Sequence, residues 1–227
     1  MLTLDLTVRQ GDFALRADWS VPKGVQVAVM GPSGAGKSTL VSVIGGFFDA
    51  DGSIIWDGAR IDGLPPGKRP VATLFQDNNL FPHLTAEQNV ALGVRPSGRL
   101  SDAERRAVKE MLATVGLPDL GARKPGALSG GQQGRVALAR AMMQDRPILL
   151  LDEPFSALGP ALKSEMIDLV TRLASEGERT VLMVTHDPED ARRMDQTVLV
   201  ADGAAHPPAP TGLLLDDPPE ALRAYLG

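Results

Sequence analysis

Apolar residues follow two spacings along the chain, and each spacing predicts a different kind of element. Residues 2–8 alternate between apolar and polar side chains, and residues 13–21 do so more weakly, which predicts two antiparallel strands. Continuous apolar runs, typical of strands buried on both faces, come later and alternate with helical patterns. We therefore predict an α/β protein with a mostly parallel sheet. The continuous runs are residues 25–30, 71–75, 148–151, 180–184 and 197–201.

The pattern changes after residue 76, where runs of β-branched residues stop and short helical segments begin. Thr85–Gln88 and Ser101–Glu104 have the spacing of capping boxes, so a helix is expected to start at each. We predict a helical subdomain at about 77–146, inserted into an α/β core of residues 1–76 and 147–227. Together they form one domain over the whole chain.

The composition excludes several functions. The chain has a net charge of −5 and no block of lysine and arginine, so we expect no nucleic-acid partner. The absence of cysteine excludes disulfides, thiolate metal sites and a cysteine nucleophile. No apolar run approaches the roughly 20 residues that span a bilayer, and the start lacks the features of a signal peptide. We expect a cytosolic protein whose membrane role comes through a partner.

A glycine-rich stretch follows the apolar run at residues 25–30 and leads into a helical segment. Its spacing is that of a phosphate-binding loop, whose backbone N–H groups converge on a phosphate together with a helix N-terminus. We expect Lys37 to reach the β- and γ-phosphates of ATP and Ser38 to ligate Mg²⁺. The alternative interpretation is a turn before an ordinary helix. The expected nucleotide-binding residues are Gly31, Pro32, Ser33, Gly34, Ala35, Gly36, Lys37, Ser38 and Thr39.

An acidic pair, Asp152 and Glu153, directly follows the apolar run at residues 148–151. A carboxylate at the carboxyl end of such a strand lies beside the phosphate loop, where Asp152 is expected to hold Mg²⁺. Glu153 comes one residue later and is placed to polarise the attacking water. The alternative interpretation is a solvated pair of acids in a loop. The phosphate loop earlier in the chain favours the ATPase interpretation.

Leu128-Ser129-Gly130-Gly131-Gln132 precedes a helix and forms a second anion-binding nest. Two phosphate-recognising surfaces in one chain suggest a composite site. This sequence resembles the ATP-binding subunit of an ABC transporter, whose signature is this Leu-Ser-Gly-Gly-Gln. The resemblance implies a head-to-tail dimer with a second copy of the chain. The signature residues that would cover the γ-phosphate bound by the partner copy are Ser129, Gly130, Gly131 and Gln132.

The resemblance extends over nearly the whole chain. Gln76 matches the Q-loop, which in the family contacts Mg²⁺ or the attacking water and responds to the membrane subunit. Ser156-Ala157-Leu158 matches the D-loop, and His186 matches the switch histidine that contacts the γ-phosphate. Taken alone, His186 would be a capping or surface histidine. The resemblance therefore implies a catalytic set of Lys37, Gln76, Glu153 and His186, with Mg²⁺ held by Ser38, Gln76 and Asp152.

Within the family, the stretch from Leu74 to Thr85 is similar to the Q-loop region of the ATPase of the bacterial thiamine importer. The pair Asn78-Asn79 is the most distinctive part, and its alternative interpretation is an ordinary turn. Family members dock a permease helix in this region, so it can carry the identity of the partner. The ATPase does not touch the transported molecule, and an importer ATPase for another substrate remains an alternative.

Three positions depart from the family pattern. Gly159 ends the D-loop where Asp is usual, which predicts altered communication between the two sites. Gly134 stands in the signature helix where Gln or Arg is common, at an expected cost of about 1 kcal/mol relative to alanine. The aromatic residue that stacks on adenine is replaced at the matching position by Gln10, and Phe13 is the nearest ring.

The sequence thus predicts an ATP hydrolase that works as a pair and powers an importer for thiamine or a related small solute. The implied partners are integral-membrane permease subunits and, indirectly, a solute-binding protein. The implied location is the cytoplasmic face of the inner (plasma) membrane, attached through the permease. The rival hypotheses are a soluble ABC ATPase that moves no solute and a catalytically silent cassette. The intact Glu153 and His186 argue against the silent cassette.

Overall fold

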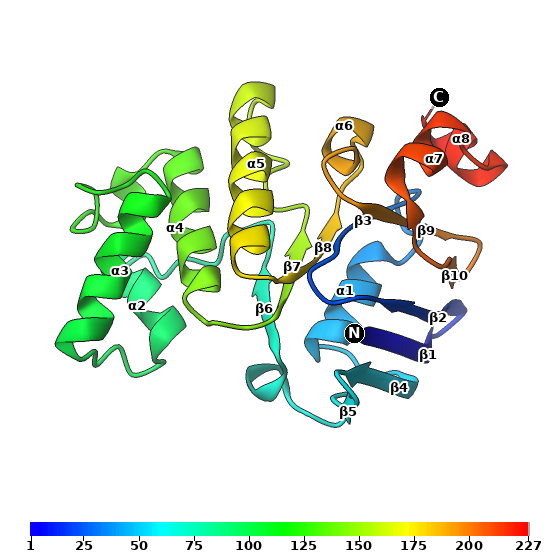
Figure 1. Ribbon diagram of the computed structural model, residues 1–227, viewed down its shortest axis with the longest axis horizontal. Coiled ribbons are helices and arrows are strands. Elements are labelled where there is room, and N and C mark those ends of the chain that lie inside the picture. The colour runs from blue at the N-terminus through cyan, green and yellow to red at the C-terminus, as the bar shows by residue number, and fades with distance from the viewer. Residues whose placement is uncertain (227) are drawn as a thin grey trace. The chain divides into compact units, whose positions relative to one another are not determined.

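The computed structural model describes residues 1–226 and has a mixed α/β architecture with helices flanking a curled sheet (Figure 1). All five continuous apolar runs form strands, as the pattern predicts. The strands are β1 (Leu2–Gln10), β2 (Phe13–Val21), β3 (Gln26–Met30), β4 (Asp51–Trp56), β5 (Ala59–Arg60), β6 (Val71–Leu74), β7 (Ile148–Asp152), β8 (Thr180–Val184), β9 (Gln196–Ala201), β10 (Ala204–Ala205) and β11 (Ala209–Pro210).

Helices occupy several of the segments between these strands, including most of residues 86–142. Among residues 1–226, no helix is both long and apolar enough to cross a membrane. The helices are α1 (Lys37–Gly45), α2 (Ala86–Val94), α3 (Asp102–Thr114), α4 (Gly130–Met142), α5 (Pro160–Glu176), α6 (Pro188–Ala191), α7 (Thr211–Asp216) and α8 (Glu220–Leu226), with 3₁₀ turns η1 (Pro66–Lys68) and η2 (Pro125–Ala127).

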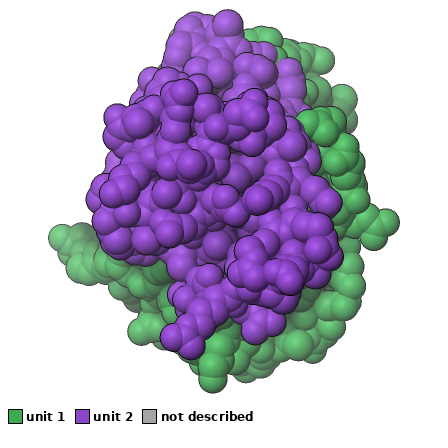
Figure 2. Space-filling view, turned by 90° about the vertical axis from the view of Figure 1, so that its left-hand side faces the viewer, with its two compact units in different colours: residues 1–71, 147–152, 171–227 green, residues 72–146, 153–170 purple. Residues whose placement is uncertain are grey.

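The chain forms two compact units, coloured separately in Figure 2. The second unit contains residues 72–146 and also residues 153–170, which the sequence analysis places in the α/β core. It therefore includes the first part of α5 as well as the expected helical segment. The first unit contains the remaining described residues. The assignment of the whole chain to a single ATPase domain stays a prediction.

The sheet of the first unit combines an antiparallel part with a parallel part. β1 pairs antiparallel with both β2 and β4, whereas β3 pairs parallel with β8 and β9, and β7 pairs parallel with β8. Every residue of β3 and β8 is buried, whereas burial alternates along β2. This difference explains why the first two strands alternate in sequence and the later ones are continuously apolar.

The tail after residue 202 contains short elements that the sequence analysis did not predict. β10 and β11 have two residues each, too few for a periodic pattern. The indole Nε1 of Trp19 donates to the carbonyl oxygen of Ala205 at 3.0 Å, and Ala205 itself is buried. The tail therefore places β10 inside the sheet, between β2, with which it pairs parallel, and β9, with which it pairs antiparallel.

Helices α2, α3 and α4 all lie in the second unit. Both predicted capping boxes are present, with Thr85 capping α2 and Ser101 capping α3. α2 and α4 approach closely at Gly93, where an added Cβ would lie 2.2 Å from the carbonyl oxygen of Arg140. This contact requires a residue without a side chain, since no Cβ fits at that distance from backbone.

Candidate nucleotide-binding site

The carboxyl ends of three neighbouring parallel strands meet at one edge of the first unit's sheet. In the strand register, Val184 at the end of β8 pairs with Val29 of β3 and with Asp152 of β7. The glycine-rich loop after β3, the carboxylate of Asp152 and the segment with His186 therefore all start from this edge. Ligands of open α/β sheets bind outside the carboxyl ends of the strands.

Two glycines of the loop are required by close contacts with neighbouring strands. Gly31 has φ 145°, and a Cβ there would lie 2.0 Å from the carbonyl oxygen of Val200. Gly36 has φ 105°, and its Cβ would lie 2.6 Å from Cζ of the Phe13 ring. A Cβ at Gly31 would clash with backbone, whereas one at Gly36 would press on the Phe13 ring at a positive φ that favours glycine. The loop is therefore held against β9 and β2 while it turns into α1.

The polar side chains at the start of α1 are held by hydrogen bonds. Lys37 is only 8% exposed, and its Nζ donates to the carbonyl oxygens of Gly31 at 2.8 Å and Pro32 at 2.9 Å. The ammonium group therefore lies across the loop it belongs to. Ser38 Oγ donates to Asp152 Oδ1 at 2.9 Å. A hydroxyl and a carboxylate in contact form a set of hard oxygen ligands, which fits Mg²⁺.

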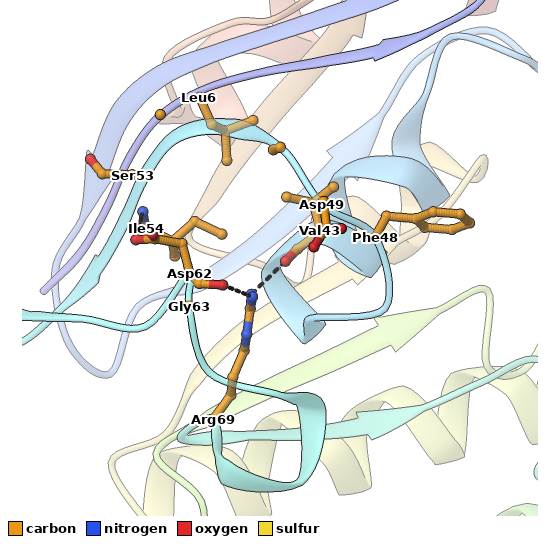
Figure 3. A pocket seen from close by; sticks show the side chains of 11 residues that line it. Leu6, Val43, Phe48, Asp49, Ser53, Ile54, Asp62, Gly63 and Arg69 are labelled. Carbon is orange, nitrogen blue, oxygen red and sulfur yellow. Dashed lines mark hydrogen bonds between the residues drawn. The ribbon is translucent and has the colours of Figure 1, made fainter.

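The opposite end of α1 is capped by a buried arginine, shown in Figure 3 beside a small pocket. Arg69 is 4% exposed, and its Nη1 donates to the carbonyl oxygens of Val43 at 2.6 Å and Ile44 at 2.9 Å. Its Nη2 donates to the carbonyl oxygen of Asp62 at 2.6 Å. Burial lowers the pKa of the Arg69 guanidinium, which nevertheless stays protonated. The sequence did not predict this contact of Arg69, because contacts between a side chain and backbone leave no periodic signal.

The segment with His186 is anchored on both sides. Thr185 Oγ1 donates to Asp190 Oδ2 at 2.7 Å and accepts from the backbone N–H of Asp187 at 3.1 Å. The Tyr225 hydroxyl, on α8, donates to the carbonyl oxygen of His186 at 3.2 Å. Sequence analysis identified the histidine but not these supports. The Tyr225 contact joins segments far apart in sequence, so no local signal marks it.

The two candidates for adenine stacking differ in position. Gln10 is exposed and lies opposite Phe13 in the register of β1 and β2. Phe13 is partly buried, and its ring lies against the phosphate loop at Gly36. The aromatic ring next to the loop is thus that of Phe13.

The signature residues form the N-terminus of α4 in the second unit. Ser129 is the N-cap, and its Oγ accepts from the backbone N–H of Gln132 at 3.3 Å. Gln132 Oε1 accepts in return from the backbone N–H of Ser129 at 3.0 Å. This is a third capping box, which sequence analysis missed although its Ser-x-x-Gln spacing is visible. Because Ser129 Oγ accepts in the cap, its own hydrogen remains available to donate.

Two further predicted residues of the second unit lie in turns. Gln76 follows β6 and is exposed. Glu153 follows β7 with φ 44°, a left-handed conformation that costs energy for a residue with a side chain. Its carbonyl oxygen accepts from the backbone N–H and the Oγ of Ser156 at 3.3 and 3.1 Å, which closes the turn. Sequence spacing predicts neither the turn nor its strain.

Gly159, the departure in the D-loop, directly precedes α5. Its carbonyl oxygen accepts from the backbone N–H of Lys163 at 2.9 Å, as an N-cap residue's does. A Cβ at Gly159 would meet no atom within 4 Å, so aspartate would fit there. A steric clash is therefore not the reason for glycine at this position.

A loop that surrounds its own lysine and presents a helix N-terminus binds the phosphates of a nucleotide, and on an α/β sheet this defines a phosphate-loop NTPase. Within that class, the chain belongs to the ABC transporter family, whose model matches residues 15–156. It is an ATPase of this family, as the sequence predicts.

Curated relatives match the whole chain. The chain is 60% identical to the thiamine import ATP-binding protein ThiQ of Cereibacter sphaeroides, with 100% of both chains covered. It is 57% identical to the ThiQ of Ruegeria sp., with 98% of this chain and 97% of that protein covered. Among solved structures, the dimeric post-hydrolysis state of the ATP-binding cassette MJ0796, bound to ADP and phosphate, is 31% identical. Its TM-score is 0.80, over 93% of this chain and 99% of that one.

Proposed function

We propose that this chain is the ATP-hydrolysing subunit of an importer for thiamine. The observation that carries this proposal is the 60% identity to a thiamine import ATP-binding protein over the full length of both chains. The bond between Ser38 and Asp152 and the buried Lys37 support an active rather than a silent cassette.

In this proposal the phosphate loop, Gly31–Thr39, binds the triphosphate of ATP. Lys37 Nζ exchanges the carbonyl oxygens of Gly31 and Pro32 for phosphate oxygens, a short movement for a side chain already inside the loop. Phe13 is the proposed stacking residue, since its ring lies against Gly36. Stacking on an aromatic ring contributes about 1 kcal/mol.

Ser38 and Asp152 are the proposed ligands of Mg²⁺, together with Gln76. A bound Mg²⁺ neutralises charge on the phosphates during transfer. The hydrogen bond between Ser38 Oγ and Asp152 Oδ1 supports the first two assignments, because it brings both oxygen ligands together at 2.9 Å. Gln76 is exposed, and its assignment rests on the family resemblance.

Glu153 is the proposed group that orients or deprotonates the attacking water. His186 and Lys37 are proposed to stabilise negative charge on the transferred phosphoryl group. In a head-to-tail dimer, Ser129, Gly130, Gly131 and Gln132 of each copy would cover the nucleotide bound by the other. The capping box supports this role, since it leaves the Ser129 hydroxyl able to donate to a phosphate oxygen. Solved dimeric cassettes of similar fold support the pairing.

The proposed partners are a second copy of the chain, permease subunits and, indirectly, a solute-binding protein. The chain would attach through the permease to the cytoplasmic face of the inner membrane. The whole chain would act as a single ABC ATPase domain.

The test is ATP turnover by the chain co-expressed and co-purified with a thiamine permease, and reconstituted in lipid vesicles with the corresponding solute-binding protein. We expect thiamine to stimulate turnover, whereas an unrelated solute of similar size and charge should not. Co-purification without thiamine stimulation would assign another substrate. Failure to associate with any permease, with ATP turnover intact, would instead support the soluble ATPase.

A further inference from the structure

An arginine of the signature helix holds the segment that follows Gln76. Arg140 lies in the last turn of α4, and its Nη1 and Nη2 donate to the carbonyl oxygens of Asn79 and Asn78, each at 2.8 Å. The planar fork of a guanidinium matches two adjacent oxygens, whereas an ammonium group is a single point charge. All these residues belong to the second unit.

The held segment has an unusual backbone. Asn78 has φ 55° and Asn79 has φ 44°, so two consecutive residues are left-handed. Asparagine tolerates this conformation better than most residues, which gives a physical reason for the Asn-Asn pair. Such backbone persists only where surrounding contacts fix it. The two bonds from Arg140 are contacts of this kind.

The side chain of Asn78 lies over Gly134 in the middle of the same helix. A Cβ on Gly134 would lie 3.9 Å from Asn78 Oδ1 and 3.9 Å from Cε of Met166. Asn78 Oδ1 is buried and has no hydrogen-bond partner among residues 1–226. Burying an unpaired amide oxygen is costly, so the fit of this turn on α4 must be maintained by its other contacts.

We propose that Arg140 is a positioning residue for Gln76. By holding the carbonyl oxygens of the two asparagines, Arg140 fixes the turn after Gln76 on α4, and Gly134 leaves room for that turn. The N-terminus of the same helix carries Ser129. A displacement of the Gln76 segment therefore moves α4 and, with it, the signature residues at its N-terminus. In the proposed dimer this couples the nucleotide site that contains Gln76 to the site of the partner copy, which the signature residues cover.

The test uses Arg140→Lys in the reconstituted complex, since this role rests on the proposed importer function. We expect kcat for ATP hydrolysis to fall roughly tenfold, the loss expected when a charged donor loses one hydrogen bond. The KM for ATP should change less than twofold, because the phosphate loop is untouched. Amide hydrogen exchange at Asn78 and Asn79 should accelerate, while exchange within α1 stays as in the wild type.

Arg135→Lys is the matched control, because Arg135 lies on the same helix but contacts other groups. Its Nη1 donates to the carbonyl oxygen of Val115 at 2.9 Å, and its Nη2 pairs with Glu165 at 2.6 Å. This variant should lose stability without the loss of kcat or the faster exchange at the asparagines. An equal loss of kcat in both arginine variants would reduce the role of Arg140 to general stability and overturn the proposal.

Gly134→Gln provides a second variant if Arg140→Lys does not fold. Its longer side chain crowds Asn78 while Arg140 remains, so it should lower kcat in the same way, whereas Gly134→Ala should keep full turnover. Wild-type kcat and exchange in Arg140→Lys would overturn the positioning role. Absence of turnover in the wild-type complex would instead refute the proposed function, so the two failures are distinguishable.

Discussion

Replacing Gly134 by alanine should raise the free energy of unfolding by about 1 kcal/mol. Gly134 lies inside α4, and the nearest atoms to an added methyl group are 3.9 Å away. This is ordinary van der Waals contact, so the methyl group fits without displacing a neighbour. Alanine restricts the unfolded chain and avoids the entropy cost of glycine in a helix.

Gly93→Ala is the matched comparison, because Gly93 also lies in a helix and gains the same propensity. Its Cβ would lie 2.2 Å from the carbonyl oxygen of Arg140, which is backbone and cannot move aside alone. Overpacking of this kind costs about 1–3 kcal/mol, which exceeds the propensity gain. The two substitutions should therefore change stability in opposite directions.

The assays are urea unfolding and thermal unfolding of the purified chain, each followed by circular dichroism, with the slope m in urea compared between variants. Gly134→Ala should raise the thermal midpoint by about 2–4 °C, and Gly93→Ala should lower it. Destabilisation by Gly134→Ala would show that the space over Gly134 is smaller than the 3.9 Å contacts indicate. A neutral Gly93→Ala would show that α2 and α4 separate at little cost.

Four further outcomes are expected. Glu153→Gln should bind ATP but not turn it over, and normal turnover in a phosphate-release assay would refute its role as the base. The pKa of Glu104 is lowered to about 2 by hydrogen bonds from the N-cap of α3 and by an arginine. The ionised Glu104 side chain should therefore stabilise the fold fully above its usual pKa of 4.5, and this stabilisation should be lost as the pH falls toward 2. In Glu104→Gln, the free energy of unfolding should no longer show this loss between pH 4.5 and 2. Tyr225→Phe should lower kcat severalfold without changing ATP affinity, because the segment with His186 loses one hydrogen bond; an unchanged kcat would make α8 irrelevant to that segment. Gly159→Asp should leave stability within a few tenths of a kcal/mol and should not lower coupled transport, since an aspartate N-cap fits there; a large drop in transport would show that the glycine is required.

Contacts between strand ends were predictable from the sequence, whereas contacts of side chains with distant backbone were not. Asp152 was expected beside the phosphate loop because both follow buried parallel strands, and the 2.9 Å bond to Ser38 agrees with that expectation. By contrast, Arg69, Arg140 and Tyr225 each bind carbonyl oxygens of remote segments. Such pairings depend on how loops fold back on the rest of the chain, and neither the periodicity nor the spacing of residues in the sequence predicts that folding.

Local patterns predicted helix starts well, but one was overlooked. The boxes at Thr85 and Ser101 precede polar first turns with an acidic residue, and both were identified. The box at Ser129 has two glycines inside it, which favour the interpretation as a phosphate nest. The two interpretations are compatible, because capping uses Ser129 Oγ as an acceptor and phosphate binding would use its hydrogen. A residue can thus satisfy a structural pattern and a functional one with different atoms.

The two helices whose N-termini carry the proposed phosphate-binding residues are both fixed at the opposite end by a guanidinium. For α1, Arg69 donates to its last carbonyl oxygens, and for α4, Arg140 donates outward to a neighbouring turn. Burial lowers the pKa of both groups, yet both stay charged because arginine does not deprotonate in proteins. A lysine in either place would supply fewer directed donors and a pKa that burial shifts more easily. These hydrogen bonds therefore keep a charged donor at every physiological pH, both at the end of α1 and between α4 and the turn at Asn78 and Asn79.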